Sequence, residues 1–159
     1  MKFIYTSASL LYHFGARTYY HLIWATESRH PLVTTECESE LHGYIIGKAN
    51  AMGCIIHAIG GMEDHIHVVA SIPPKISVAD FVKQIKGSSA YHLNNSSFFA
   101  ASGFSWQHGY GVLTLGSKQL EQAKMYVLNQ KTHHSNRTFI PALERIEDED
   151  NRGGKSTQK

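Results

Sequence analysis

The chain has 159 residues, of which 42% are hydrophobic and 18% charged, and its formal net charge at pH 7 is +2. This length predicts a single domain whose core is large enough to fold without disulfide or metal staples. No run approaches the roughly 20 apolar residues of a membrane-spanning helix, so we expect no membrane partner. The mild basic excess permits a nucleic-acid partner without requiring one.

The cysteines and histidines narrow the kinds of binding site and the cellular location that we expect. Cys37 and Cys54 do not form a CxxC pair, so neither a disulfide framework nor a thiolate zinc site is indicated, and we expect a reducing, cytoplasmic location. Met1–Arg17 lack the long apolar stretch of a signal peptide, and we expect residues 1–17 to form an N-terminal arm. The 11 histidines are the more unusual feature, because imidazoles bind metals and phosphate.

Strand-like and helix-like patterns alternate along the chain. The expected elements are a strand over residues 19–26, a helix from Thr34 or Thr35 to a stop at Gly53, strands over 54–59 and 65–72, a helix capped by Ser77, a strand over 104–113 and a final helix capped by Ser117. This order predicts an α+β domain with a ferredoxin-like antiparallel sheet and helices packed on one face. We expect the domain to span residues 18–140 and residues 141–159 to form a polar, disordered tail.

Two histidines open the third expected strand, in the stretch Asp64-His65-Ile66-His67. Because side chains alternate faces along a strand, His65 and His67 point the same way and Ile66 points the other way. Two imidazoles on one face are half a metal site. The alternative interpretation is a polar strand face with two solvated histidines.

The final helix carries a second group of polar residues. Tyr126 and Gln130 are four residues apart, and His133 and His134 follow three and four residues after Gln130, so all four can project along one face. Two imidazoles and one amide oxygen leave positions open on a metal, which can then polarise a phosphoryl oxygen. A tyrosine hydroxyl near such a metal can attack phosphorus and form a covalent phosphotyrosine. The alternative for Tyr126 alone is a packed helix aromatic.

Basic and hydroxyl side chains elsewhere suit contacts to a phosphate backbone. Lys83 and Lys86 lie three residues apart on the second expected helix, and Ser88 and Ser89 follow them. Arg29 stands near the end of the first strand, a position that often carries function. A solvated helix face and a solvated turn are the alternative interpretations.

Five stretches together resemble the HUH single-tyrosine transposases, and within them the REP-associated tyrosine transposases and their insertion-sequence relatives. The stretches are Tyr20-His21-Leu22-Ile23-Trp24-Ala25-Thr26, Asp64-His65-Ile66-His67, Ile85-Lys86-Gly87-Ser88-Ser89, Trp106-Gln107-His108-Gly109-Tyr110-Gly111 and Tyr126-Val127-Leu128-Asn129-Gln130-Lys131-Thr132-His133-His134. Each stretch alone is weak evidence for the resemblance, but all five in this order are specific evidence for it. Val112-Leu113-Thr114-Leu115 departs from relatives, which more often have a phenylalanine and a serine there.

The resemblance implies an enzyme that recognises hairpins near the ends of a mobile element and nicks and rejoins single-stranded DNA beside them. It implies that His65 and His67 are metal ligands, that Gln130 is the third ligand, and that Tyr126 is the nucleophile that forms a 5′-phosphotyrosine. The expected metal is Mg²⁺ or Mn²⁺. The expected assembly is a homodimer, with a monomer as the alternative.

Two rival functions stand beside this one. The first is a domesticated protein that binds hairpin DNA without turnover, which the modest charge and the departure from relatives suggest. The second is an unrelated metal hydrolase that cleaves small phosphoesters with an activated water.

Overall fold

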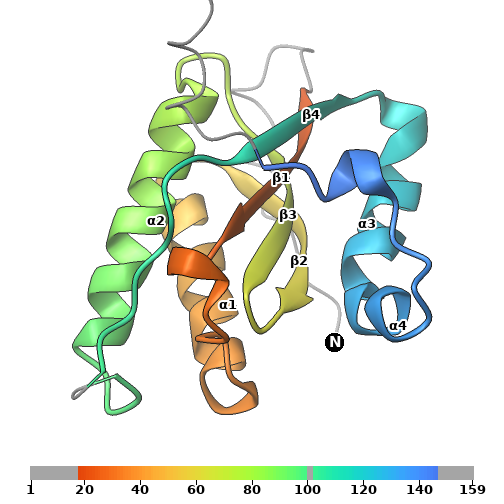
Figure 1. The fold of residues 1–159 in the computed structure, drawn as a ribbon. Coiled ribbons are helices and arrows are strands. Elements are labelled where there is room, and N and C mark those ends of the chain that lie inside the picture. Colours follow the sequence, from red (N-terminus) through yellow and green to blue (C-terminus); the bar gives the residue numbers. More distant parts are fainter. Residues whose placement is uncertain (1–17, 100–101, 147–159) are drawn as a thin grey trace, which may run out of the picture.

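A four-stranded antiparallel sheet with strand order β2-β3-β1-β4 forms the centre of the computed structural model, which describes residues 18–99 and 102–146 (Figure 1). The elements are β1 (Tyr19–Ala25), η1 (Glu27–Arg29), α1 (Thr35–Ala51), β2 (Ile55–Met62), β3 (His65–Ser71), α2 (Val78–Asn94), β4 (Gly111–Leu115), η2 (Ser117–Gln119), α3 (Leu120–Leu128), α4 (Gln130–Ser135) and η3 (Pro141–Leu143). This strand order is that of a ferredoxin-like sheet, so the predicted α+β class is confirmed. The expected N-terminal arm, residues 1–17, and the expected tail beyond residue 146 lie outside the described residues.

The crossover helices α1 and α2 cover one face of the sheet, as predicted, and enclose the main apolar core. Alternate strand residues point toward these helices, among them Trp24 from β1 and Ile66 from β3. The helices contribute the buried residues Cys37, Leu41, Ile45 and Ala49 from α1 and Phe81, Val82, Ile85 and Leu93 from α2. Ser77 caps α2, because its Oγ accepts the Asp80 N–H at 3.0 Å. Gly53, with a φ of 75°, follows the end of α1 as expected.

α3 and α4 lie on the opposite face of the sheet, which is the face of His65 and His67, so the expected packing of helices on one face holds for α1 and α2 but not for the last helices (Figure 1). The expected single helix is broken at Asn129, whose φ of −103° and ψ of 19° are not helical. A Cβ on Gly60 of β2 would collide with the carbonyl oxygen of Val127, so this glycine allows α3 to approach the sheet closely. Tyr126 and Gln130 therefore lie on two consecutive helices above one sheet face.

The fourth strand begins later than predicted. The aromatic stretch 104–113 was expected to form it, but β4 starts at Gly111, and Trp106 pairs with the end of β1 only as an isolated bridge. Trp106 turns into the core beneath α2, and residues 107–110 form a bulge that stays joined to β1 at its start, where the Gln107 N–H donates to Ala25 O at 3.0 Å. Lys86 Nζ stabilises the bulge by donating hydrogen bonds to its carbonyl oxygens at 2.7 and 2.8 Å. Among the described residues, no helix has the length and apolar character needed to cross a membrane.

Candidate active site

His65 and His67 project from β3 toward α3, as their alternation predicts. Both side chains are buried, with 2% and 0% of their surface exposed. Their Nε2 atoms are buried and make no hydrogen bond to any described atom. A buried ring nitrogen without a hydrogen bond is costly, so the pair fits a ligand site and not a solvated strand face.

The other nitrogen of each ring is held by a neighbour. Asp64 Oδ1 lies 2.6 Å from His65 Nδ1, and His21 Nε2 lies 2.9 Å from His67 Nδ1. The hydrogen bond from His65 is the main cause that lowers the pKa of Asp64 to about 2. Burial lowers the pKa of His67, which favours the neutral ring that a metal requires. Metal-binding histidines show this arrangement, in which one nitrogen faces the ion and a second partner fixes the other.

Tyr126 reaches the same space from α3. Its hydroxyl donates a hydrogen bond to Glu144 Oε1 at 2.5 Å and accepts one from the Ile140 backbone N–H at 3.1 Å. Its ring stacks on His133, with centroids 4.8 Å apart, and meets the His67 ring edge-on at 6.0 Å. Burial and the hydrogen bond to Glu144 raise the pKa of Tyr126, so the hydroxyl is protonated in this conformation.

Gln130 is the first residue of α4, and only 1% of its surface is exposed. Neither its amide oxygen nor its amide nitrogen has a hydrogen-bond partner among the described atoms. The amide is close enough to Tyr126 to oppose the rise in the pKa of that hydroxyl. A buried amide that is unpaired within the protein fits a residue whose polar atoms serve a bound ligand.

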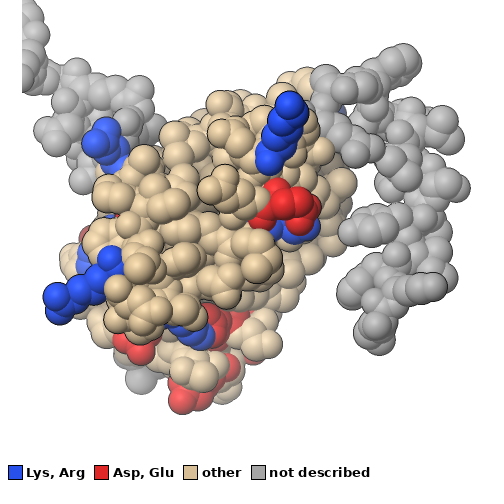
Figure 2. Space-filling model, turned by 90° about the vertical axis from the view of Figure 1, so that its right-hand side faces the viewer, with Lys and Arg blue, Asp and Glu red and all other residues tan. Residues whose placement is uncertain are grey.

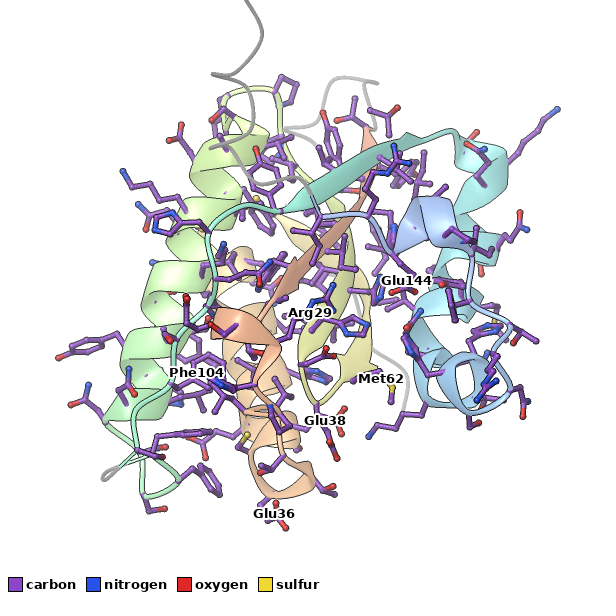
Figure 3. All side chains as sticks on the ribbon, in the orientation of Figure 1. Arg29, Glu36, Glu38, Met62, Phe104 and Glu144 are labelled. Carbon is purple, nitrogen blue, oxygen red and sulfur yellow. The ribbon has the colours of Figure 1, made fainter. Side chains whose placement is uncertain are left out.

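Glu144 enters the site from the segment after η3, between the sheet and α3 (Figure 3). Its Oε2 lies 3.3 Å from His67 Nε2, 3.5 Å from His65 Nε2 and 3.7 Å from His134 Nε2. Burial alone would raise the pKa of Glu144, but the close approach of His67, the hydrogen bond from Tyr126 and the charge of His65 lower it to about 2. The carboxylate is therefore ionised and joins the nucleophile candidate to the histidine pair.

Sequence patterns did not identify Glu144. The tail was expected to begin at residue 141, whereas residues 141–146 belong to the described structure and carry this carboxylate into the site. The one available signal was the apolar run 139–143 directly before it, which is unusual for a solvated tail. Its contact with β3 depends on tertiary packing, which no local spacing reveals.

His65, His67 and Glu144 can together hold a divalent metal. One nitrogen or oxygen atom from each lies within 4.8 Å of the others. Ligand atoms about 2.0–2.2 Å from a metal lie roughly 3.0–3.4 Å from one another in octahedral or tetrahedral geometry. The two histidine nitrogens stand 3.3 and 3.5 Å from Glu144 Oε2, close to that spacing. Imidazoles suit Mn²⁺ and Zn²⁺, and the carboxylate also suits Mg²⁺.

Of the predicted phosphate-contacting residues, Arg29 is the one that lies near this site. Its guanidinium lies 3.2 Å from Asp64 Oδ2, and both residues line a groove of about 480 Å³ together with His65, His134 and Glu144. Arg29 has a left-handed backbone with a φ of 57°, a strained conformation that is often found at functional sites. On the α3 and α4 side of the molecule, Figure 2 shows lysines and arginines in separate places, some of them beside acidic residues, and not gathered in one patch.

The other four predicted contacts lie on α2, on the far side of the sheet. Ser89 is fully buried and its Oγ accepts the Trp106 indole N–H at 3.0 Å, so a backbone contact by Ser89 does not fit its burial. Lys86 holds the 107–110 bulge, and Ser88 Oγ faces a carbonyl oxygen of its own helix at 3.5 Å. Lys83 and Lys86 both line a groove of about 470 Å³ beside that bulge.

The part of the chain that carries these residues is similar in sequence to known proteins. The sequence profile of the IS200-like transposases matches residues 16–130, which is more than half of the chain. The chain belongs to the IS200-like transposase family. This IS200-like transposase is 29% identical over 120 residues to the ISDra2 transposase TnpA of Deinococcus radiodurans, a match that covers 70% of this chain and 82% of TnpA. The resemblance stated from the motifs is thereby confirmed for the family.

Two solved structures resemble this transposase in fold. The crystal structure of a Deinococcus radiodurans R1 protein assigned as a transposase has a TM-score of 0.60 and 30% identity, covering 74% of this chain and 93% of that one. A REP-associated tyrosine transposase bound to a REP hairpin has a TM-score of 0.56 and 16% identity, covering 84% and 74%. At 16% identity the second likeness concerns the fold alone. The family match includes His65, His67, Tyr126 and Gln130 but ends before Glu144.

Proposed function

We propose that this transposase nicks and rejoins single-stranded DNA beside hairpins, through a covalent 5′-phosphotyrosine on Tyr126. The observation that carries the proposal is that the Tyr126 hydroxyl and the Nε2 atoms of His65 and His67 all face one carboxylate, that of Glu144. DNA as the partner is supported by the family and by the REP hairpin bound to the REP-associated relative.

We propose that His65, His67 and Gln130 hold Mg²⁺ or Mn²⁺, with Glu144 as an additional ligand. The unpaired, buried amide of Gln130 supports its part in this set, because its oxygen is a suitable ligand for either ion. A metal bound there acts as a Lewis acid on the phosphoryl oxygens and orients the scissile bond. The surrounding side chains keep bulk water away from the reacting groups, since His67, Tyr126 and Gln130 are all buried.

The covalent step exchanges one phosphoester bond for another. Tyr126 Oη attacks phosphorus, the bond between phosphorus and the 3′ oxygen breaks, and the proton from the tyrosine leaves with the 3′ oxygen as a hydroxyl. Because a phosphodiester is conserved, a second 3′ hydroxyl can displace Tyr126 and rejoin the strand without a nucleotide cofactor. Glu144 Oε1 accepts the hydrogen bond of the hydroxyl at 2.5 Å, so its ionised carboxylate can take up the proton during the attack and pass it on.

The test uses labelled single-stranded oligonucleotides that contain a hairpin, with Mg²⁺ or Mn²⁺ present. We expect a covalent protein–DNA adduct on denaturing gels, its loss in Tyr126→Phe, and its retention in the control Tyr91→Phe, because Tyr91 is a solvent-exposed residue of α2. An adduct that persists in Tyr126→Phe would contradict the assignment of the nucleophile. Metal-dependent cleavage that survives the double substitution His65→Ala and His67→Ala would remove the histidine pair from the mechanism.

One observation favours the second candidate, a hairpin-binding protein without turnover. Burial and Glu144 raise the pKa of Tyr126, so its hydroxyl is protonated, which suits a residue that binds DNA without attacking it. Salt-dependent hairpin binding without any adduct in Mg²⁺ or Mn²⁺ would establish this alternative. A phosphotyrosine isolated from the wild-type protein would exclude it.

The proposed reaction has two forms: Tyr126 acts with the histidines of its own chain, where the Tyr126 and His67 rings lie 6.0 Å apart, or with those of the other subunit in the expected homodimer. Mixing Tyr126→Phe subunits with His67→Ala subunits tests this point. If the helix acts in cis, the mixture stays inactive. Restored cleavage would show that the tyrosine of one subunit serves the histidines of the other.

A further inference from the structure

His21 is a buried histidine that the proposed DNA chemistry does not use. It lies on β1, next to β3 in the sheet, and only 2% of its surface is exposed. Its side chain points to the α3 face, the same face as His67. Burying a polar ring there without a purpose would cost stability, so its contact with His67 calls for an explanation.

The contact is a hydrogen bond in the plane of both rings. The two imidazole planes differ by only 11°, their centroids are 5.0 Å apart, and His21 Nε2 lies 2.9 Å from His67 Nδ1. The nitrogen–nitrogen distance is much shorter than the distance between the ring centroids, so the two rings meet edge to edge and are not stacked face to face. One proton therefore lies between the two nitrogens, and one ring donates it to the other.

The direction of that bond follows from the opposite edge of His67. His67 Nε2 faces Glu144 Oε2 and the Nε2 of His65, where it must offer a lone pair to bind a metal. The single proton of neutral His67 then resides on Nδ1, and His21 Nε2 accepts it. His21 is itself buried, which disfavours a charged ring, so its Nε2 offers a lone pair to this proton at 2.9 Å.

We propose that His21 is a positioning residue that fixes the tautomer and the ring orientation of His67, so that Nε2 is ready to bind the metal. Asp64 has the same role for His65, because its carboxylate lies 2.6 Å from His65 Nδ1. The two ligand rings are thus fixed by different chemistry, one by a charged group near the surface and one by a buried neutral imidazole. The proposal rests on the metal role of His67 but not on the chemistry of Tyr126.

The first test uses the wild-type protein with ¹⁵N-labelled histidine and saturating Mg²⁺, because without a metal the ionised Glu144 carboxylate, 3.3 Å from His67 Nε2, can hold the proton on that nitrogen. NMR spectra of the imidazole nitrogens should place the His67 proton on Nδ1 and show a nitrogen–nitrogen coupling across the bond to His21. A proton on His67 Nε2, or the absence of that coupling, overturns the proposal, and neither result depends on whether a variant folds.

The second test compares variants by Mn²⁺ titration and by the same spectra. His21→Leu should move the His67 proton off Nδ1 and weaken Mn²⁺ binding by about 10–100-fold. His21→Gln should restore both, because its amide oxygen reaches the place of the imidazole Nε2 and can accept the proton. The control His57→Leu removes a histidine that bonds to Ser71 instead and should leave both readouts unchanged.

Weaker Mn²⁺ binding with an unchanged His67 tautomer would assign His21 a packing role only and would also overturn the proposal. These readouts contain no DNA. A failure of the phosphotyrosine reaction is therefore distinguishable from a failure of the role proposed for His21.

Discussion

The two faces of the sheet are built from the same strands but have different chemistry. Toward α1 and α2, the strands present Leu22, Trp24, Ile66 and Val68, which join a continuous apolar core. Toward α3, the same strands present buried histidines beside a small apolar cluster of Ala58, Val69, Ala123 and Val127. Period-two alternation makes this division possible, because neighbouring residues of one strand serve opposite faces.

The face toward α1 and α2 contributes stability, whereas the face toward α3 carries the candidate site. Apolar burial toward α1 and α2 stabilises the fold in proportion to the area removed from water. The α3 face instead holds polar atoms without hydrogen bonds in His65, His67 and Gln130, each of which lowers stability until a ligand satisfies it. The apolar face must therefore offset the cost of the site, and substitutions on the two faces should have different effects.

The largest effect is expected on the apolar face, in Phe81→Ala. Phe81 is fully buried in the core between α2 and the sheet, so its removal leaves a cavity that should lower the free energy of unfolding by about 3–5 kcal/mol. Urea denaturation of the protein measures the loss. Phe98→Ala is the control, because Phe98 is an exposed side chain whose removal should change stability by less than about 0.5 kcal/mol. Similar losses in both variants would contradict the location of the core.

A smaller effect is expected where α3 meets the sheet, in Gly60→Ala. The new Cβ would collide with the Val127 carbonyl oxygen, so α3 must shift, and we expect a loss of about 1–3 kcal/mol. Gly43→Ala is the matched control, since no atom lies within 4 Å of the added Cβ on α1, and alanine should stabilise that helix by about 0.5–1 kcal/mol. Thermal unfolding of both variants gives the comparison. Equal melting temperatures would show that α3 does not pack against Gly60.

The smallest effect on stability, but a specific one on the site, is expected in Glu144→Gln. Burial and the hydrogen bond to Glu144 both raise the pKa of Tyr126, and removal of the negative charge leaves burial as the main cause. The pKa of Tyr126 should therefore fall but stay above its ordinary value. NMR titration of ¹³C-labelled tyrosine measures this pKa, with the Tyr126 signal assigned by its loss in Tyr126→Phe. An unchanged or higher pKa would mean that Glu144 does not act on this hydroxyl.

Regular spacing within one element was enough to predict part of this molecule. The alternation on β3 correctly placed His65 and His67 on one face, and the order of strands and helices gave the ferredoxin-like sheet. The four-residue spacing of Tyr126 and Gln130 brought both to the site even though the helix breaks at Asn129 between them. Local periods succeed here because the residues concerned are neighbours along a single strand or a nearly continuous helix.

Contacts between distant segments were not predictable in the same way. His21 was placed on a strand, but its contact with His67 follows from the register of β1 against β3. Glu144 comes from a segment whose acidic composition resembles a solvated tail. Trp106 was expected within the fourth strand, whereas that strand starts at Gly111 and the Trp106 indole N–H donates to Ser89 Oγ in the core.

The position of Glu144 also decides how far this protein can be shortened. The family match ends at residue 130, and composition suggested a domain boundary at residue 140. A chain cut at residue 140 would keep the sheet, both candidate ligand histidines and the tyrosine, yet it would lack the carboxylate that accepts the hydrogen bond of the Tyr126 hydroxyl. Shortened versions that preserve this hydrogen bond must therefore include Glu144.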